Sequence, residues 1–277
     1  PGRGRHGAVL QKGLGFVLAC VKPDGSIESH GTRMYSHAFS TLFLAEVYGT
    51  TGDEAVRRAL QRATRFIVDA QNDEGGWRYR PKADTSDMSV TVCQVMALRA
   101  ARNMGINVPW STIENAVAYV RRSAVSERDI RYFGTAGLGI ARGGFKYQIG
   151  RDAMEGPHRS SYPLTAAGVT TLLGAGLYDD PLVANGLDYM RAHENTINGR
   201  MDHYFFFYGH YYAAQAHFIA GGEWWRNYFQ RIREMLLRGQ GSDGSWENRV
   251  GPGRAFSTAV AVLILQIPYG YLPIFQR

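Results

Sequence analysis

The sequence contains few cysteines and lacks the long apolar and basic runs that mark several classes of protein. Its two cysteines, Cys20 and Cys93, have no CxxC or other metal-binding spacing, and they leave the cellular compartment open. No apolar run reaches the roughly 20 residues that a transmembrane helix needs. No Lys or Arg run and no nucleic-acid-binding motif is present, so we expect no nucleic-acid partner.

The start of the chain and its charge give two further expectations. The chain begins PGRGRHG, without an initiating Met, so we expect a processed chain or part of a longer protein, from which any signal peptide is gone. The net charge is +7, which favours anionic partners such as diphosphates, acidic polysaccharides or lipid headgroups.

The most informative pattern that is present occurs twice. Residues 62–77 read RATRFIVDAQNDEGGW, and residues 231–246 read RIREMLLRGQGSDGSW. The shared offsets hold a Gln, a Gly and a Trp: Gln71, Gly75 and Trp77 in one copy, Gln240, Gly244 and Trp246 in the other. A spacing that recurs to the residue indicates a repeat protein, in which each copy is one supersecondary unit.

Three weaker copies begin at Lys12, Asn115 and Asn185. The copy at Asn115 keeps its helical half, and its Gly turn is displaced to Gly143-Gly144 by a Gly-rich insertion at about 125–162. The glycines of this insertion are Gly134, Gly137, Gly139, Gly143, Gly144, Gly150 and Gly156. The insertion is either a loop or mobile lid over a cavity mouth, or a surface loop without function.

Each copy is typical of a helical hairpin. The first helix has apolar residues on one side, at i, i+3, i+4 and i+7 spacing, as in residues 59–70. The second helix is more apolar all round, as in Ser89–Ala101 and Ser257–Ile267, which predicts burial on every side. We therefore expect one all-α domain over residues 1–277, with five or six hairpins arranged as an inner and an outer ring of helices.

The Gln-x-x-x-Gly-x-Trp pattern resembles the repeat of squalene and oxidosqualene cyclases. The segment GGWRYRPKADTSDMSVTVCQVMALRAA is similar to the matching region of protein prenyltransferase β subunits. The resemblance implies an α/α toroid, a barrel of hairpins around a central cavity. It also implies that the Gln and Trp of each copy tie the outer helix to its turn by hydrogen bonding and stacking. Five hairpins are fewer than these families usually have, so the ring is smaller or open, or part of a longer protein is missing.

The catalytic signatures of both families are incomplete here. Squalene-hopene cyclases protonate an alkene with an Asp-x-Asp-Asp motif, and the nearest segment, residues 84–87, has Ser86 where the proton-donating Asp is expected. Asp87 is also a good N-cap for the helix that follows. Prenyltransferases hold zinc with Asp, Cys and His, but Val90 stands where the His is expected and Cys93 lies in an apolar run. The resemblance therefore implies neither a zinc site nor any other cofactor.

Alignment of the second helices from their Gly turns predicts a recurring polar position near each N-terminus. It holds His37, Ser89, Thr165, His210 and Ser257, which we expect to form a polar collar at one end of an apolar cavity. Helix N-termini at this end would favour an anionic group. We expect further ligand contacts close by, from Tyr35, Asp87, Asp202, His203, Tyr204 and Tyr208.

Three functions are compatible with these residues. In the first, aromatic side chains line a cavity for an isoprenoid-like or lipidic ligand and stabilise carbocations through their π faces. In the second, His210, Tyr208, His203 and Arg200 perform acid–base chemistry on an acidic polysaccharide. In the third, the toroid is a non-catalytic scaffold or binding module. A metal site is disfavoured because the histidines lack i, i+4 spacing.

We favour the first function, with terpene-cyclase-like activity as its enzymatic form. The predicted catalytic residues are Asp87, Tyr208 and His210, and His37 is a predicted ligand contact. The aromatic side chains also fit a simple packing role in the core, and the His and Tyr groups fit hydrogen bonding inside the barrel.

Overall fold

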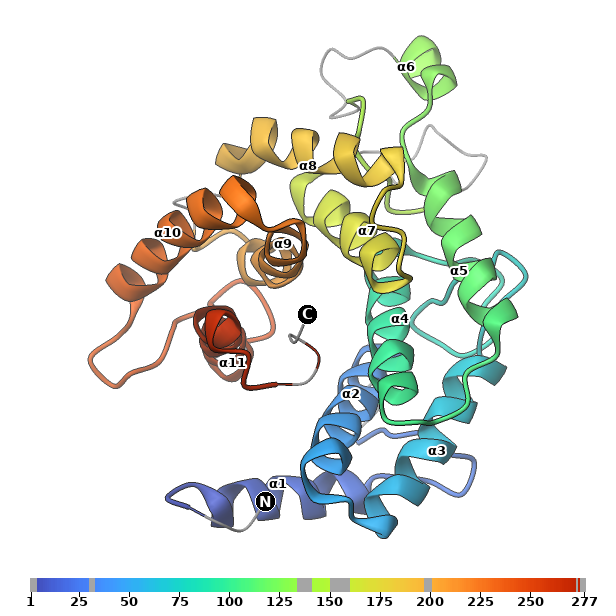
Figure 1. The fold of residues 1–277 in the computed structure, drawn as a ribbon, viewed down its shortest axis with the longest axis vertical. Helices are drawn as coiled ribbons and strands as arrows, with labels where there is room; N and C mark the ends of the chain where they lie inside the picture. Colours follow the sequence, from blue (N-terminus) through green and yellow to red (C-terminus); the bar gives the residue numbers. More distant parts are fainter. Residues whose placement is uncertain are drawn as a thin grey trace. The chain divides into compact units, whose positions relative to one another are not determined.

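The computed structural model describes residues 4–29, 33–133, 141–149, 160–196, 201–272 and 274. These residues form α-helices joined by turns (Figure 1), and within them β-pairing is limited to three isolated bridges. Over the same ranges, no helix has both the length and the apolar character needed to cross a membrane.

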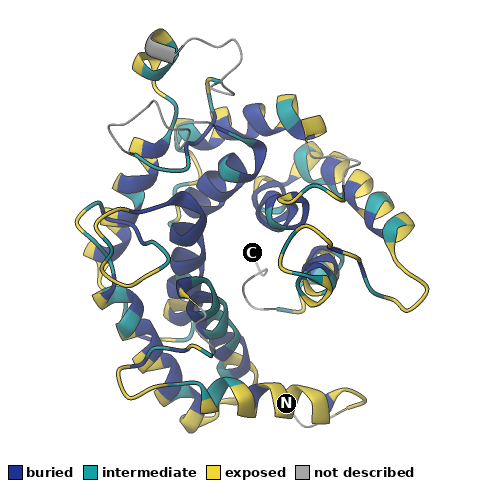
Figure 2. Cartoon of the chain, turned by 180° about the vertical axis from the view of Figure 1, so that it is seen from behind, coloured by how far each residue is buried: buried dark blue, intermediate teal, exposed yellow. Residues whose placement is uncertain are grey.

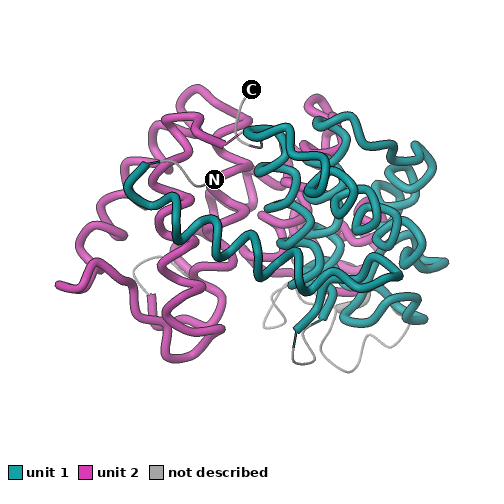
Figure 3. Tube along the Cα trace, turned by 90° about the horizontal axis from the view of Figure 1, so that it is seen from below, with its two compact units in different colours: residues 1–119 teal, residues 120–277 magenta. Residues whose placement is uncertain are grey.

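The chain divides into two compact units, residues 1–119 and 120–277 (Figure 3). Helix α5 (Trp110–Ser123) carries the chain from the first unit into the second. The expectation of one domain over residues 1–277 stays a prediction.

The first unit contains four further helices. The helices α2 and α4 pack side by side, and α3 packs against both of them. Their bounds are α1 (Gly7–Ala19), α2 (Met34–Thr51), α3 (Glu54–Asp69) and α4 (Met88–Asn103). Asp53 begins α3, because its carboxylate accepts hydrogen bonds from the amides of Ala55 and Val56.

The second unit is built around α7 and α9, which pack against each other. Helix α8 covers α7, while α10 and α11 both contact α9. The bounds are α6 (Glu127–Phe133), α7 (Tyr162–Gly174), α8 (Pro181–His193), α9 (Phe206–Ala220), α10 (Gly222–Gly239) and α11 (Arg254–Gln266), with short 3₁₀ turns at Glu194–Thr196 and Ile267–Tyr269.

The second helix of each hairpin is buried to different degrees (Figure 2). Helix α4 is buried along nearly its whole length, as its all-round apolar sequence predicts. The same prediction is wrong for α11, where the side chain of Val262 is 52% exposed. The reason is packing, since α9 covers one side of α11 and the opposite side stays open to solvent.

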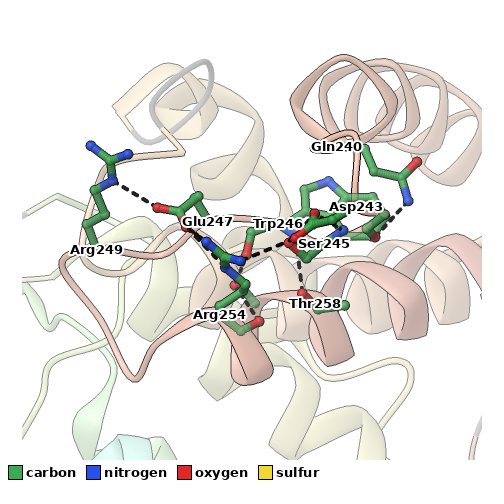
Figure 4. A network of polar contacts seen from close by, with 10 residues as sticks. Gln240, Asp243, Ser245, Trp246, Glu247, Arg249, Arg254 and Thr258 are labelled. Atoms are coloured by element: carbon green, nitrogen blue, oxygen red, sulfur yellow. Dashed lines mark hydrogen bonds and ion pairs between the residues drawn. The ribbon is translucent and has the colours of Figure 1, made fainter.

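The two strong sequence copies make the same internal hydrogen bonds. Gln71 Nε2 donates to the carbonyl of Gly75 at 2.7 Å, and Trp77 Nε1 donates to the carbonyl of Ile67 at 2.8 Å. The C-terminal copy repeats these bonds, with Gln240 to Gly244 at 2.9 Å and Trp246 to Leu236 at 2.8 Å (Figure 4). In both copies the Gln closes the turn and the Trp ties the turn to the preceding helix.

Three turn glycines lie directly against the first helix of the next copy. A Cβ atom added at Gly25, Gly75 or Gly143 would come within 2.4 Å of a backbone carbonyl oxygen, so only Gly fits there. These oxygens belong to Arg62, Asn115 and Asn185, respectively. Gly143 thus occupies the place in the third copy that Gly75 occupies in the second.

The Gly-rich insertion is described only in part. Its described portion contains α6 and residues 141–149, where the buried Phe145 packs against α7. Lys146 and Asp129 form an ion pair at 2.9 Å that joins this segment to α6. Gly134, Gly137, Gly139, Gly150 and Gly156 lie outside the described residues. The lid hypothesis therefore stays a prediction.

Candidate active site

The recurring polar position near the start of each second helix has a structural role. In three copies its side chain accepts a hydrogen bond from the backbone N–H that follows the turn: His37 from Ile27 at 3.0 Å, Thr91 from Trp77 at 3.2 Å and Thr165 from Phe145 at 3.1 Å. The predicted register was therefore wrong at Ser89, because Thr91 holds this place. The position lies four residues after the N-cap, and the cap sets the register.

The C-terminal copy divides this role between two neighbouring residues. Ser257 Oγ donates to the carbonyl of Trp246 at 2.5 Å, and Thr258 Oγ1 accepts from the amide of the same Trp at 3.1 Å. The polar groups of Ser257 and Thr165 thus hold the turns of their own copies, and both residues are buried. The structure does not bring the five predicted collar residues to equivalent positions.

His37 is fixed through both ring nitrogens. Nδ1 accepts from the amide of Ile27, and Nε2 lies 3.1 Å from the carbonyl oxygen of Ala63, to which it donates. Burial lowers the pKa of this imidazole to about 4, so the ring is neutral at pH 7. His37 therefore joins the first turn to α3, and its nitrogens are already used.

The two carboxyl oxygens of Asp87 have different surroundings. Its Oδ1 caps α4 by accepting from the amide of Val90 at 2.8 Å, while Oδ2 is buried and has no hydrogen-bond partner among the described residues. Desolvation raises the pKa of this carboxyl, because burial disfavours the charged form. A proton carried by this carboxyl lies on Oδ2, because Oδ1 already accepts from Ser89 and Val90.

A short hydrogen-bond chain leads to this carboxyl from a neighbouring helix. The hydroxyl of Tyr35, on α2, donates to Ser89 Oγ, and Ser89 Oγ donates to Asp87 Oδ1 at 2.6 Å. Burial raises the pKa of Tyr35 well above its usual range, so its proton stays in place at neutral pH. The structure thus brings together three predicted site residues: Tyr35, Asp87 and Ser89.

The other residues of the 84–87 segment face elsewhere. Ser86 Oγ donates to Asn72 Oδ1 at 2.7 Å, and its amide donates to Glu74 at 2.6 Å, so Ser86 secures the preceding turn. Asp84 is exposed. Within this segment, Asp87 is therefore the one buried carboxyl. Val90 and Cys93, at the positions compared with zinc ligands, are buried in α4.

His210 lies inside the second unit, fully buried against Tyr228. The Tyr228 hydroxyl donates to the His210 carbonyl at 3.3 Å, so Nδ1–H of His210 donates to that hydroxyl at 3.0 Å. Nε2 is buried without a partner among the described residues, and burial lowers the pKa of the ring to about 3. His210 is thus a neutral group in the core, and no pattern in the sequence predicted its hydrogen-bond partner, Tyr228.

The remaining predicted contacts of this unit are less buried than His210. Asp202 and Tyr204 are exposed on the turn before α9, and His203 Nδ1 accepts from the amide of Phe205 at 3.2 Å. Tyr208 is half-buried, with its ring edge-on to that of Tyr212 at a centroid distance of 5.0 Å. Arg200 lies outside the described residues. The hypothesis of acid–base chemistry on a polysaccharide therefore stays a prediction.

Comparisons with known proteins agree with the helical architecture. No family model matches the sequence. A stretch of 98 residues, 34% of the chain, is 32% identical to drimenyl diphosphate synthase of Streptantibioticus cattleyicolor and spans 18% of that enzyme's length.

Two solved structures show the likeness over almost the whole chain. Both are variants of the type II terpene cyclase MstE from Scytonema, in complex with geranylgeranyl dihydroxybenzoate as substrate. They match at TM-scores of 0.60 and 0.61 with 15% and 14% identity, over 97% of this chain and 74% of theirs. The likeness confirms the predicted fold class, a terpene-cyclase-like α/α toroid.

Proposed function

We propose that this protein binds an isoprenoid-like substrate and starts its cyclisation by protonating an alkene with Asp87. The observation that carries the proposal is the state of this carboxyl, which is buried, has a raised pKa and leaves Oδ2 without a partner. The terpene-cyclase-like fold and the likeness to drimenyl diphosphate synthase supply the substrate class.

The proposed reaction requires no cofactor, because Asp87 supplies the proton that starts it. The O–H bond at Asp87 Oδ2 breaks and a C–H bond forms at one alkene carbon, which leaves a carbocation on the other carbon. The π electrons of the next alkene close a ring, and the last cation loses a proton to water or a neighbouring base. A proton on Oδ2 suits this step because no protein acceptor competes with the alkene for it.

Tyr35 and Ser89 hold Oδ1 of Asp87, since both hydroxyl groups are oriented as donors toward the carboxyl. This leaves Oδ2 as the oxygen that gives up its proton to the alkene and regains one from water after the product leaves. We assign them as positioning residues rather than as groups that touch the substrate. Since Asp87 is fully buried, substrate binding requires its covering side chains to move.

The test is turnover of prenyl diphosphates and prenyl alcohols of different chain lengths, followed by mass spectrometry of the products. Asp87→Asn should lower turnover by about 100-fold or more, because general acids contribute this much. Asn is an equally good helix cap and carries no buried charge, so the variant should keep the wild-type free energy of unfolding.

Asp84→Asn is the matched control, because it changes an exposed carboxyl three residues away. Equal turnover by Asp87→Asn and wild type would remove Asp87 from the chemistry. Tight prenyl binding without any turnover would instead identify a non-catalytic binding module.

A further inference from the structure

A half-enclosed cleft of about 430 Å³ lies in the first unit, beside Tyr35, where the hydrogen-bond chain to Asp87 begins. It is bordered by the turn at residues 22–28, the start of α2, Phe66 of α3 and the segment Tyr79–Pro81. Tyr79 connects the cleft to the candidate site, since its ring centroid lies 6.0 Å from that of Tyr35. No residue of this cleft other than His37 was predicted to contact a ligand.

Among the charged side chains around the cleft, Arg33 and Arg80 are available to bind an anion. Lys22 and Glu28 form an ion pair with each other, so they neutralise one another. Asp24 contributes one negative charge, and its carboxylate accepts from the amide and hydroxyl of Ser26 at 2.9 and 2.8 Å, which lowers its pKa. Within the described residues, neither Arg33 nor Arg80 forms an ion pair with a carboxylate, and both are exposed at the cleft.

Tyr79 holds the guanidinium groups on this side in place. Arg33 lies over its ring at 5.5 Å and Arg78 at 5.8 Å, both within cation–π range. Arg78 also donates to Thr85 Oγ1 at 2.7 Å, which leaves Arg33 as the guanidinium of this pair that lines the cleft. The contact with Tyr79 therefore fixes the position of the Arg33 guanidinium at the cleft.

The floor of the cleft is apolar. Ile27 and Met34 are each 3% exposed, and Phe66 lies beside them. The ring of His37 is neutral at this point and adds no charge. The cleft therefore offers guanidinium groups at its rim and apolar contact below them, which suits an anionic group attached to a short stretch of hydrocarbon.

We propose that this cleft binds a phosphate-type anion through Arg33 and Arg80, with the apolar floor receiving the adjoining carbon chain. A planar guanidinium group can donate two parallel hydrogen bonds to two oxygens of one phosphate group, which makes phosphate esters and diphosphates the best-matched ligands. The anion is either the diphosphate of a prenyl substrate or a free phosphate compound. The prenyl source rests on the function proposed above, whereas anion binding does not.

The first test is calorimetric titration with inorganic pyrophosphate, which requires no turnover. The Arg33→Ala/Arg80→Ala variant should bind at least about tenfold more weakly than wild type, because two charge-assisted contacts are lost. The matched control is Arg58→Ala/Arg65→Ala, which removes the same charge from exposed positions on α3 and should bind as wild type does. Equal weakening in both variants, or none in either, would overturn the proposal.

Two further arms separate the possible outcomes. Arg80→Glu changes a single exposed side chain and should also weaken pyrophosphate binding, which guards against misfolding of the double variant. A prenyl diphosphate that binds more tightly than both pyrophosphate and its prenyl alcohol, with dependence on Arg33 and Arg80, assigns the site to the substrate. Affinity equal to that of pyrophosphate assigns it to free phosphate compounds. Arginine-dependent binding without turnover would keep the anion site and remove the proposed cyclase function.

Discussion

The turns at residues 71–77 and 240–246 have the same sequence pattern and the same internal hydrogen bonds, but different surroundings. Gln71 Nε2 also donates to the carbonyl of Thr112 at 2.9 Å, and Gly75 is buried against Asn115 of α5. At the second turn, Gln240 and Gly244 are exposed, and no part of a following helix lies within 4 Å of a Cβ added at Gly244.

The difference shows which contacts a single copy specifies by itself. The Gln–Gly and Trp–carbonyl bonds form in both turns, so they depend on the copy alone. Glycine is required for close approach only where a following helix is present. The exposed turn is instead held by charged contacts, in which Arg254 pairs with both Asp243 and Glu247 (Figure 4).

The largest expected effect comes from the two tryptophans. Trp77→Ala and Trp246→Ala should each lower the free energy of unfolding by about 3–5 kcal/mol, because both rings are buried and each loses a hydrogen bond. Chemical denaturation monitored by circular dichroism measures both. A cost below about 1 kcal/mol at either position would contradict the shared role of the two residues.

The stability costs of Gly75→Ala and Gly244→Ala should distinguish the two turns most clearly. Gly75→Ala should cost about 2–4 kcal/mol, because its Cβ would clash with the Asn115 carbonyl in addition to the strain of a positive φ. Gly244→Ala has only the φ strain and should cost about 1–2 kcal/mol. The same denaturation experiment compares them, and equal costs would show that the following helix does not matter.

A smaller difference is expected for the glutamines. Gln71→Ala should cost about 1–3 kcal/mol, because it leaves the carbonyls of Gly75 and Thr112 without their donor. Gln240→Ala removes one bond at an exposed site and should change stability by less than about 0.5 kcal/mol. A greater loss at Gln240 would reverse the proposed order.

A pH-dependent effect distinguishes the first turn, which is held by His37 where the 71–77 turn uses Thr91. Burial lowers the pKa of His37 from 6.5 to about 4, so the unfolded chain binds the proton more readily than the folded chain. Its contribution is fully present above pH 6.5 and is lost as the pH falls toward 4, by up to about 1.4 kcal/mol per pH unit. His37→Gln should therefore flatten the stability profile between pH 6.5 and 5, relative to wild type. An unchanged slope would place the titration elsewhere.

The sequence predicted the local features of the fold well. The helical period of the apolar residues, the turn glycines and the Asp87 cap could be predicted because each depends on residues close together in the chain. The register of the polar position was missed at Ser89, since it follows the cap rather than the turn. The bond from Tyr35 to Ser89 joins residues 54 apart, and such pairings depend on how α2 and α4 pack. For the same reason, no pattern in the sequence indicated that Arg33 and Arg80 would share a cleft.

Deuterium labelling tests the central claim, proton-initiated cyclisation by Asp87, most directly. The Asp87 proton exchanges with solvent between turnovers, so a cyclic product formed in D₂O should carry one deuterium at the carbon protonated first. Asp87→Asn should form no such product, while Asp84→Asn should match wild type. A cyclic product without deuterium, or a labelled product from Asp87→Asn at the wild-type rate, would contradict the claim.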